Sequence, residues 1–196
     1  MRFSLRHLPA LLGILILLIS IPLSVYLIQQ QQELRKMAEE IQAVTCDGNN
    51  DQVKINTAIN ALPTTGGTIS LPARQCNLAG SIVISKNNLT LEGQGTTTIL
   101  FLVDNTNRDV ITVTDKNNLQ IRNLKIDGNK TRQTSESIGI KFTGAGSMTV
   151  EDVLIQNIRT GIAVEGGASN LTVANNTIIN TDNVAIFARI NHGAAQ

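Results

Sequence analysis

The stretch "NLTVANNTIIN", residues 170–180, contains two short β-branched segments separated by a pair of asparagines. Leu171 and Val173 alternate with polar residues, which is the pattern of a strand with one buried face. Asn175 then interrupts this pattern, and asparagine is one of the few residue types that adopts the left-handed backbone region at low cost. We therefore predict that the asparagine turns the chain between two strands.

The same pattern occurs at three earlier places in the chain. The four matching segments begin at Asn88, Asn118, Ser147 and Asn170. The predicted turning residues stand two positions after the second apolar residue of each first strand: Gly93, Asn123, Asp152 and Asn175. A second strand follows, and a second set of turning residues comes two positions after its end: Gly128, Asn157 and Asn180. Matching offsets in successive units indicate a repeat architecture.

A third strand completes each unit. These strands read "VITVT" from Val110, "IGIKFTG" from Ile138, "TGIAVEGG" from Thr160 and "VAIFAR" from Val184. Alternation directs four pairs inward: Ile111/Val113, Ile140/Phe142, Ile162/Val164 and Ile186/Ala188. Three short strands per turn predict an all-β fold, a parallel β-helix whose coils stack about 4.8 Å apart. A β-sandwich, with turns about every 8–12 residues, is the alternative, but it gives no reason for the matching offsets.

The segment "DQVKINTAINALP", residues 51–63, is predicted to be a helix that caps the N-terminal end of the stack. Its apolar residues near helical spacing are Val53, Ala58, Ile59 and Leu62. No comparable helix follows the last strand. For the C-terminal end we therefore expect either further coils in a longer protein or a partner that covers the last coil.

The first 28 residues differ from the rest of the chain. Residues 8–28 contain no charged side chain over 21 positions, and about 20 apolar residues are enough to span a membrane as a helix. Arg2 and Arg6 favour a cytoplasmic N-terminus. A cleaved signal peptide is the alternative, but no small-residue cleavage site follows. We predict a single-pass membrane anchor over residues 1–28, a polar helical stalk over residues 29–44 and a β-helix over residues 45–196, C-terminally incomplete, outside the cytoplasm.

Cys46 and Cys76 are the only cysteines, and both follow the predicted anchor. In an oxidising compartment they are predicted to form a disulfide. From Cys46 onward the chain has 12 Lys and Arg against 12 Asp and Glu. Nucleic-acid binding needs a basic surplus, so no nucleic-acid partner is expected.

Residues 46–95 resemble the opening of the pectate-lyase-like superfamily. The motifs that carry the resemblance are Asp47-Gly48, Asp51, Ala58-Ile59, Gly66-Gly67-Thr68 and Leu71-Pro72-Ala73, while Arg74 stands where the family usually has Gly. The resemblance implies a right-handed parallel β-helix and a polysaccharide partner. The superfamily includes lyases, hydrolases and epimerases as well as surface proteins without known activity, so the resemblance leaves the activity open.

In the active members of this superfamily the substrate lies along the sheet of third strands. Alternation places Thr112, Lys141, Ala163 and Phe187 in one outward column, and Thr114, Thr143, Glu165 and Arg189 in the next. Glu165 and Arg189 are the predicted catalytic pair, since neighbouring strands bring them within about 5 Å. Elimination from a uronate needs a base and a cation that neutralises the carboxylate, and Arg189 and Lys141 are predicted to fill these roles.

The remaining predicted substrate-binding residues are Phe187, Asp182 and Arg159. Phe187 is placed to stack on a sugar ring, and the other two lie in loops that flank the sheet. Some lyases of this fold use calcium, which takes about 6–8 oxygen ligands. Glu165 and Asp182 do not supply that many, so no metal site is assigned and the cofactor is left unknown.

Each site residue also has a structural interpretation. Glu165 and Arg189 are alternatively an exposed ion pair, Asp182 a turn residue, and Phe187 a residue covered by a further segment. The predicted function is a membrane-anchored protein that binds or modifies polysaccharide. The alternatives are a lyase or epimerase acting on acidic glycans and a non-catalytic, adhesive surface module.

Overall fold

The computed structural model describes residues 41–189. The predicted membrane anchor over residues 1–28 and most of the predicted stalk lie outside the described residues. Within residues 41–189, no helix is both long enough and apolar enough to cross a membrane.

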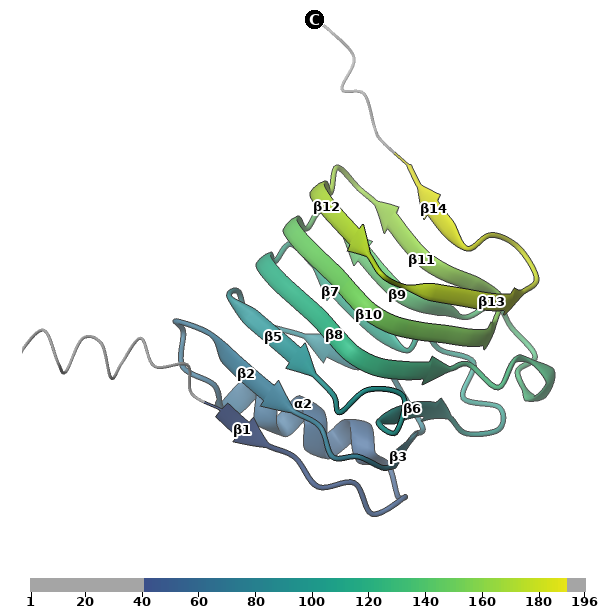
Figure 1. Ribbon diagram of the computed structural model, residues 1–196, viewed down its shortest axis with the longest axis horizontal. Helices are drawn as coiled ribbons and strands as arrows, with labels where there is room; N and C mark the ends of the chain where they lie inside the picture. Colours follow the sequence, from purple (N-terminus) through teal and green to yellow (C-terminus); the bar gives the residue numbers. More distant parts are fainter. Residues whose placement is uncertain (1–40, 190–196) are drawn as a thin grey trace, which may run out of the picture. The chain divides into compact units, whose positions relative to one another are not determined.

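The described chain winds through successive coils whose strands stack into two sheets (Figure 1). The larger sheet contains, in order, β1 (Ile41–Ala43), β2 (Gly67–Ser70), β5 (Leu89–Glu92), β8 (Asn117–Asp127), β10 (Gly146–Ile158) and β12 (Ser169–Ala174). Its remaining strands are β3 (Gln75–Leu78), β6 (Ile99–Leu102) and β13 (Thr177–Thr181). The second sheet contains β4 (Ile82–Ile84), β7 (Ile111–Thr114), β9 (Ile138–Thr143), β11 (Thr160–Glu165) and β14 (Ile186–Ala188).

The pairing between these strands decides between the two predicted fold classes. Every strand pair in both sheets is parallel. A β-sandwich of this kind is built from antiparallel sheets, so that alternative is wrong. The parallel β-helix is confirmed.

The first strand extends the β-helix beyond its predicted boundary. Residues 41–43, assigned to the end of the helical stalk from the sequence, form β1 and pair with β2. The N–H of Val44 continues this pairing by donating to the carbonyl of Ser70 at 3.0 Å. The edge of β2 presents backbone groups that need partners, and β1 supplies them. The described part of the β-helix therefore begins at Ile41 instead of residue 45.

The second sheet has the register that alternation predicts. Ile111 pairs with Ile140, and Ile140 pairs with Ile162. The next inward row is Val113, Phe142 and Val164. All six side chains are buried. Ile186 continues the first row above Ile162, but it is 47% exposed because no described coil lies over it.

The first predicted corner stacks in register. Asn123, Asp152 and Asn175 each have a φ of 54°. Arg122 pairs with Glu151, which places Asn123 and Asp152 at adjacent positions on successive coils. The predicted left-handed corner is confirmed for these three residues.

The second predicted corner is held together by side chains as well as by backbone conformation. Asn157 and Asn180 have φ values of 50° and 55°. The Nδ2 group of Asn157 donates to the Asp127 carboxylate at 3.0 Å, and the Nδ2 of Asn180 donates to Asn157 Oδ1. Each coil therefore satisfies polar groups of the coil next to it.

A third left-handed column was not assigned as a corner from the sequence. It consists of Asn88, Asn118, Ser147 and Asn170, whose φ values are 52°, 57°, 52° and 54°. The Nδ2 of Asn118 donates to Asn88 Oδ1 at 3.0 Å. The signal was present in the sequence, since every unit begins with one of these residues.

Gly93 and Gly128 stand in the corner columns for a reason that differs from the prediction. Neither is among the glycines with positive φ. A Cβ atom on Gly93 would lie 2.4 Å from the carbonyl oxygen of Asn123 and 2.8 Å from the Leu124 Cβ. Glycine is required at this position because the next coil approaches the backbone closely.

We expect the substitution Gly93→Ala to lower the free energy of unfolding by about 2–3 kcal/mol, because the added methyl group overpacks a tight contact between coils. The matched control is Gly167→Ala. Gly167 has a φ of 81°, and a Cβ added there would meet no atom within 4 Å, so this change costs only about 1 kcal/mol of backbone strain. Urea unfolding of both variants measures the difference. A Gly93→Ala variant no less stable than the control would contradict the close-approach explanation.

The predicted capping helix is α2 (Asp51–Ala61). Ile55, Ile59 and the following Leu62 are buried, and the helix packs against β2, β3 and β4. Val53, which the sequence placed near the apolar stripe, is exposed. Residues 55, 59 and 62 follow the i, i+4, i+7 pattern of a single helix face more closely, and Val53 falls off that face.

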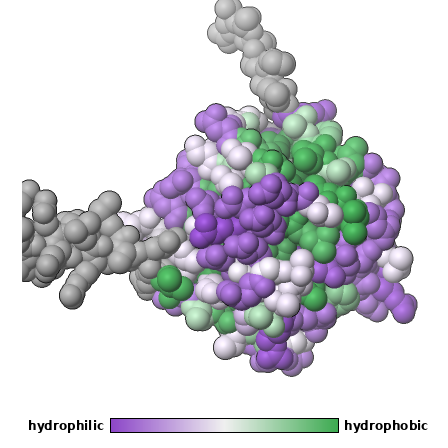
Figure 2. Space-filling view, in the orientation of Figure 1, coloured by the Kyte–Doolittle hydropathy of each residue, from purple (hydrophilic) through white to green (hydrophobic). Residues whose placement is uncertain are grey.

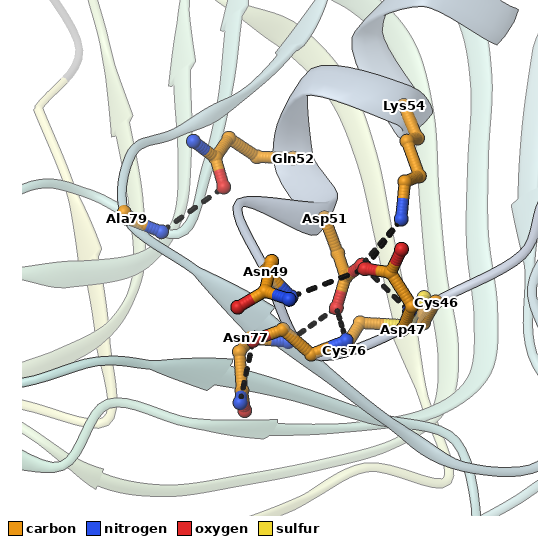
Figure 3. Close-up of polar contacts among 10 residues, drawn as sticks. Cys46, Asp47, Asn49, Asp51, Gln52, Lys54, Cys76, Asn77 and Ala79 are labelled. Atoms are coloured by element: carbon orange, nitrogen blue, oxygen red, sulfur yellow. Dashed lines mark hydrogen bonds and ion pairs between the residues drawn. A yellow bond between two sulfur atoms is a disulfide. The ribbon is translucent and has the colours of Figure 1, made fainter.

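The capping helix is joined to the first coil by two kinds of link (Figure 3). The predicted disulfide between Cys46 and Cys76 is confirmed. Beside it, the fully buried carboxylate of Asp51 accepts backbone N–H groups from Asp47 at 2.9 Å, Gly48 at 3.0 Å and Asn77 at 2.9 Å. Asp51 thus ties the start of the helix to β3.

Candidate functional site

The outward face of the second sheet carries two columns of side chains, and we call it the third-strand face. The first column is Thr112, Lys141, Ala163 and Phe187, and the second contains Thr114, Thr143 and Glu165. Arg189 follows β14, where its N–H donates to the carbonyl of Val164 at 2.8 Å. Val83 extends the first column by one coil, below Thr112.

Lys141 and Glu165 form an ion pair across this face. The Lys141 Nζ lies 3.5 Å from Glu165 Oε2, and both side chains are partly exposed. Lys141 is opposite Ala163, so Glu165 is its diagonal neighbour two residues further along β11. Long side chains reach such diagonal neighbours. Among residues 41–189, the ion pair of Glu165 is therefore with Lys141, and not with Arg189 as the strand columns predict.

Phe187 and Arg189 lie on the last described coil, and both are exposed. Phe187 is 40% exposed, and three aliphatic side chains on the same coil are also exposed: Ile179, Val184 and Ile186. Figure 2 shows the corresponding apolar surface in green, at the upper right. An aromatic ring therefore remains accessible at one end of the third-strand face.

The loops that lead into the third strands differ greatly in length. Residues 128–137, which include the short helix η2 (Lys130–Arg132), join β8 to β9. Arg159 alone joins β10 to β11, and residues 182–185 join β13 to β14. The two longer loops project from the same side of the stack (Figure 1). The shortest turn therefore lies between two longer loops.

The two longer loops contact each other past the Arg159 turn. Lys130 forms an ion pair with Asp182 at 2.5 Å, and Asn183 Nδ2 is 3.5 Å from Glu136 Oε1. Asp182, predicted to bind substrate, is therefore engaged in a contact between loops. These loops form one border of the third-strand face.

The acidic residues of this region are dispersed. Within residues 41–189, no group of three or more His, Cys, Asp or Glu side chains is arranged to hold a metal ion. Glu165 and Asp182 each face a lysine.

Solved structures with a similar backbone support the fold. The chain is similar to the A-modules of two mannuronan C-5 epimerases from Azotobacter vinelandii, AlgE4 (TM-score 0.60, 19% identity, 74% of this chain and 51% of that one) and AlgE6 (TM-score 0.58, 21% identity, 73% and 49%). It is also similar to a putative glycosyl hydrolase from Parabacteroides merdae (TM-score 0.66, 17% identity, 76% and 80%). The chain spans about half the length of the two epimerase modules.

A comparison with curated protein sequences finds no match. A family model described as a right handed beta helix region matches residues 57–195. This match covers most of the chain and agrees with the stacked parallel coils. The protein therefore belongs to the right-handed β-helix family, with a pectate-lyase-like fold.

Proposed function

We propose that the protein binds or modifies a polysaccharide on the third-strand face. The observation that carries this proposal is the in-register face itself, on which Lys141, Glu165 and Phe187 are all accessible at the surface. Sugars are recognised by a few polar groups together with apolar and aromatic surface, and this face offers both kinds. The similarity to mannuronan epimerase modules and to a putative glycosyl hydrolase supports the same class of ligand.

A catalytic form of this proposal is an epimerase or lyase that acts on acidic glycans. Both reactions remove the proton next to a sugar carboxylate, so they need a base and a cation that stabilises the developing charge. Lys141 is proposed as the cation, because a substrate carboxylate can replace Glu165 as its partner. Arg189, beside Glu165 in the register, is the proposed base. A non-catalytic glycan-binding module is the alternative, favoured by the dispersed carboxylates.

We also propose that residues 1–28 anchor the protein in a membrane, with the β-helix outside the cytoplasm. The uncharged segment over residues 8–28 supports the anchor. The Cys46–Cys76 disulfide supports the compartment, since disulfides persist where the environment is oxidising. Alkaline extraction of membranes that contain the full chain tests this proposal, because an anchored protein stays in the pellet and a peripheral one is released.

We expect Lys141→Ala to weaken binding to the preferred glycan by about ten-fold, the effect of losing one hydrogen bond to a charged group. The matched control is Lys125→Ala, because Lys125 belongs to the other sheet, where it pairs with Ile99 and Leu154. Binding to a panel of acidic and neutral polysaccharides is measured by isothermal titration calorimetry. Equal losses in the two variants, or no loss in Lys141→Ala, would place the binding site elsewhere.

The same proteins separate the catalytic form from the binding module. A lyase releases unsaturated uronates, which are followed by their new ultraviolet absorbance, and an epimerase changes the sugar composition without chain cleavage. Arg189→Ala is expected to abolish turnover while the protein remains folded, because it removes the proposed base. Binding by the wild-type protein with neither kind of turnover identifies a module.

A further inference from the structure

Arg159 differs from the neighbouring basic residues because its side chain has no polar partner within the described part of the chain. Its Nε atom is buried without a hydrogen bond. Among residues 41–189, no hydrogen bond or ion pair involves its guanidinium group, whereas Lys130 pairs with Asp182 and Lys141 pairs with Glu165. A guanidinium group has five N–H donors. The Nε–H donor is the one shown to be buried without a partner, and an acceptor bound beside it would restore the hydrogen bond that buried donors normally make.

The surroundings of Arg159 hold it in place without neutralising it. Its carbonyl accepts the N–H of Asn183 at 2.9 Å, which keeps the turn in register with the loop above. The acidic residues of the flanking loops are engaged elsewhere, Asp182 with Lys130 and Glu136 with Asn183. Arg159 therefore contributes an uncompensated positive charge at the border of the third-strand face.

A second unpaired polar group lies at the same position one coil below. The register pairs Ile138 with Thr160, so Ser137 and Arg159 occupy equivalent positions on adjacent coils. Ser137 is 0% exposed, and its Oγ has no hydrogen-bond partner among the residues that the structure describes. Within residues 41–189, two buried polar groups without a partner therefore occupy equivalent positions on adjacent coils.

We propose that Arg159 binds an anionic substituent of the polysaccharide, a carboxylate or a sulfate ester. This inference rests on the proposed function and narrows it to acidic glycans. The planar guanidinium group binds such groups through two parallel N–H···O hydrogen bonds. The ion pair between Lys130 and Asp182 keeps the two longer loops in place beside the Arg159 turn.

The test compares Arg159→Gln and Arg159→Lys with the matched control Arg132→Gln. Arg132 is an exposed arginine of the same loop region whose Nε lies 3.9 Å from the Asp104 carboxylate. Binding of the full chain to polygalacturonate, dextran sulfate and neutral dextran is measured at constant salt. Thermal unfolding of each variant establishes that it is folded.

We expect Arg159→Gln to weaken binding to at least one of the two polyanions by about ten-fold, with dextran binding unchanged. Arg159→Lys should give an intermediate loss, since lysine keeps the charge but not the paired donors. The affinity of the Arg132→Gln control for each glycan should remain within about two-fold of the wild-type affinity, because exposed, widely spaced ion pairs contribute little. A loss for polygalacturonate alone identifies a carboxylate, and a loss for dextran sulfate alone identifies a sulfate ester. If Arg159→Gln does not fold, Arg159→Lys alone decides.

Two results overturn the inference in distinguishable ways. If the wild-type protein binds glycans but the Arg159 variants bind polyanions as well as the Arg132 control does, only the role of Arg159 fails. If the wild-type protein binds none of these three glycans and none of the wider panel, the proposed function fails and this inference fails with it.

Discussion

Replacing Cys46 and Cys76 together with alanine is expected to lower the free energy of unfolding by about 4 kcal/mol. The disulfide joins residues separated by 30 positions, and a cross-link of this span restricts the unfolded chain by about 3–4 kcal/mol. Both cysteines are buried, so their truncation also removes some packing against the core. Small domains have total stabilities of only about 5–15 kcal/mol, which makes this a large fraction.

Urea unfolding of the oxidised wild-type protein and the double variant measures this effect. Wild-type protein unfolded under reducing conditions is the control, since it loses the cross-link but keeps both side chains. The reduced wild-type protein and the double variant should unfold at similar urea concentrations. A double variant within about 1 kcal/mol of the oxidised protein would mean that the disulfide restricts the unfolded chain far less than its span implies.

The substitution Asp51→Asn is expected to lower the free energy of unfolding by about 3 kcal/mol. The buried Asp51 carboxylate accepts three backbone N–H groups, from Asp47, Gly48 and Asn77. An asparagine side chain has one oxygen and one NH₂ group in place of the two carboxylate oxygens. The NH₂ group then faces at least one of the three backbone N–H groups, and two donors cannot form a hydrogen bond with each other. Leaving buried donors unpaired costs about 1–3 kcal/mol each, and hydrogen bonds to charged groups are at the upper end.

Asp47→Asn is the matched control, because it removes a neighbouring carboxylate that is largely exposed. The hydrogen bond from Lys54 holds the pKa of Asp47 below its ordinary value of 3.8. The contribution of Asp47 to the free energy of unfolding is therefore present above its ordinary pKa of 3.8 and is lost as the pH falls through the lowered pKa. Urea unfolding of the two variants is compared at pH 7. A midpoint for Asp51→Asn that matches the Asp47→Asn midpoint would show that the buried carboxylate does not secure the cap.

The disulfide and Asp51 fasten the same two segments, and their effects should not add. The disulfide joins Cys46 to Cys76. The residues that follow them, Asp47 and Asn77, donate their backbone N–H groups to Asp51 (Figure 3). Once one link is removed, the start of the helix is freer to move, so loss of the other costs less. The combined variant is therefore expected to lose less stability than the sum of the two changes.

The candidate site was predictable only to the level of the strand columns. Alternation along each third strand placed Lys141, Glu165 and Phe187 outward, and the register confirms this placement. It did not predict that Glu165 pairs with Lys141, because a diagonal contact depends on the reach of two long side chains. The alternation of residues along a strand indicates only the neighbours within one column.

The contacts between the loops could not be predicted from the sequence either. The loop lengths were visible in the sequence, but the contact between Lys130 and Asp182 joins residues 52 positions apart. Predicting it requires the direction in which each loop leaves the stack. The absence of a polar partner for Arg159 within the described residues is likewise a property of packed neighbours, and no local pattern indicates it.

The sequence by itself determined the repeating coil, because both of its signals are local. Inward residues alternate along a strand, and Asn, Asp and Gly mark positions where the backbone turns or the next coil approaches closely. Only the tertiary structure decided which charges are compensated by a partner and which are not. That outcome depends on which side chains of separate coils come within a few ångströms of each other, and the spacing of residues along the chain does not contain this information.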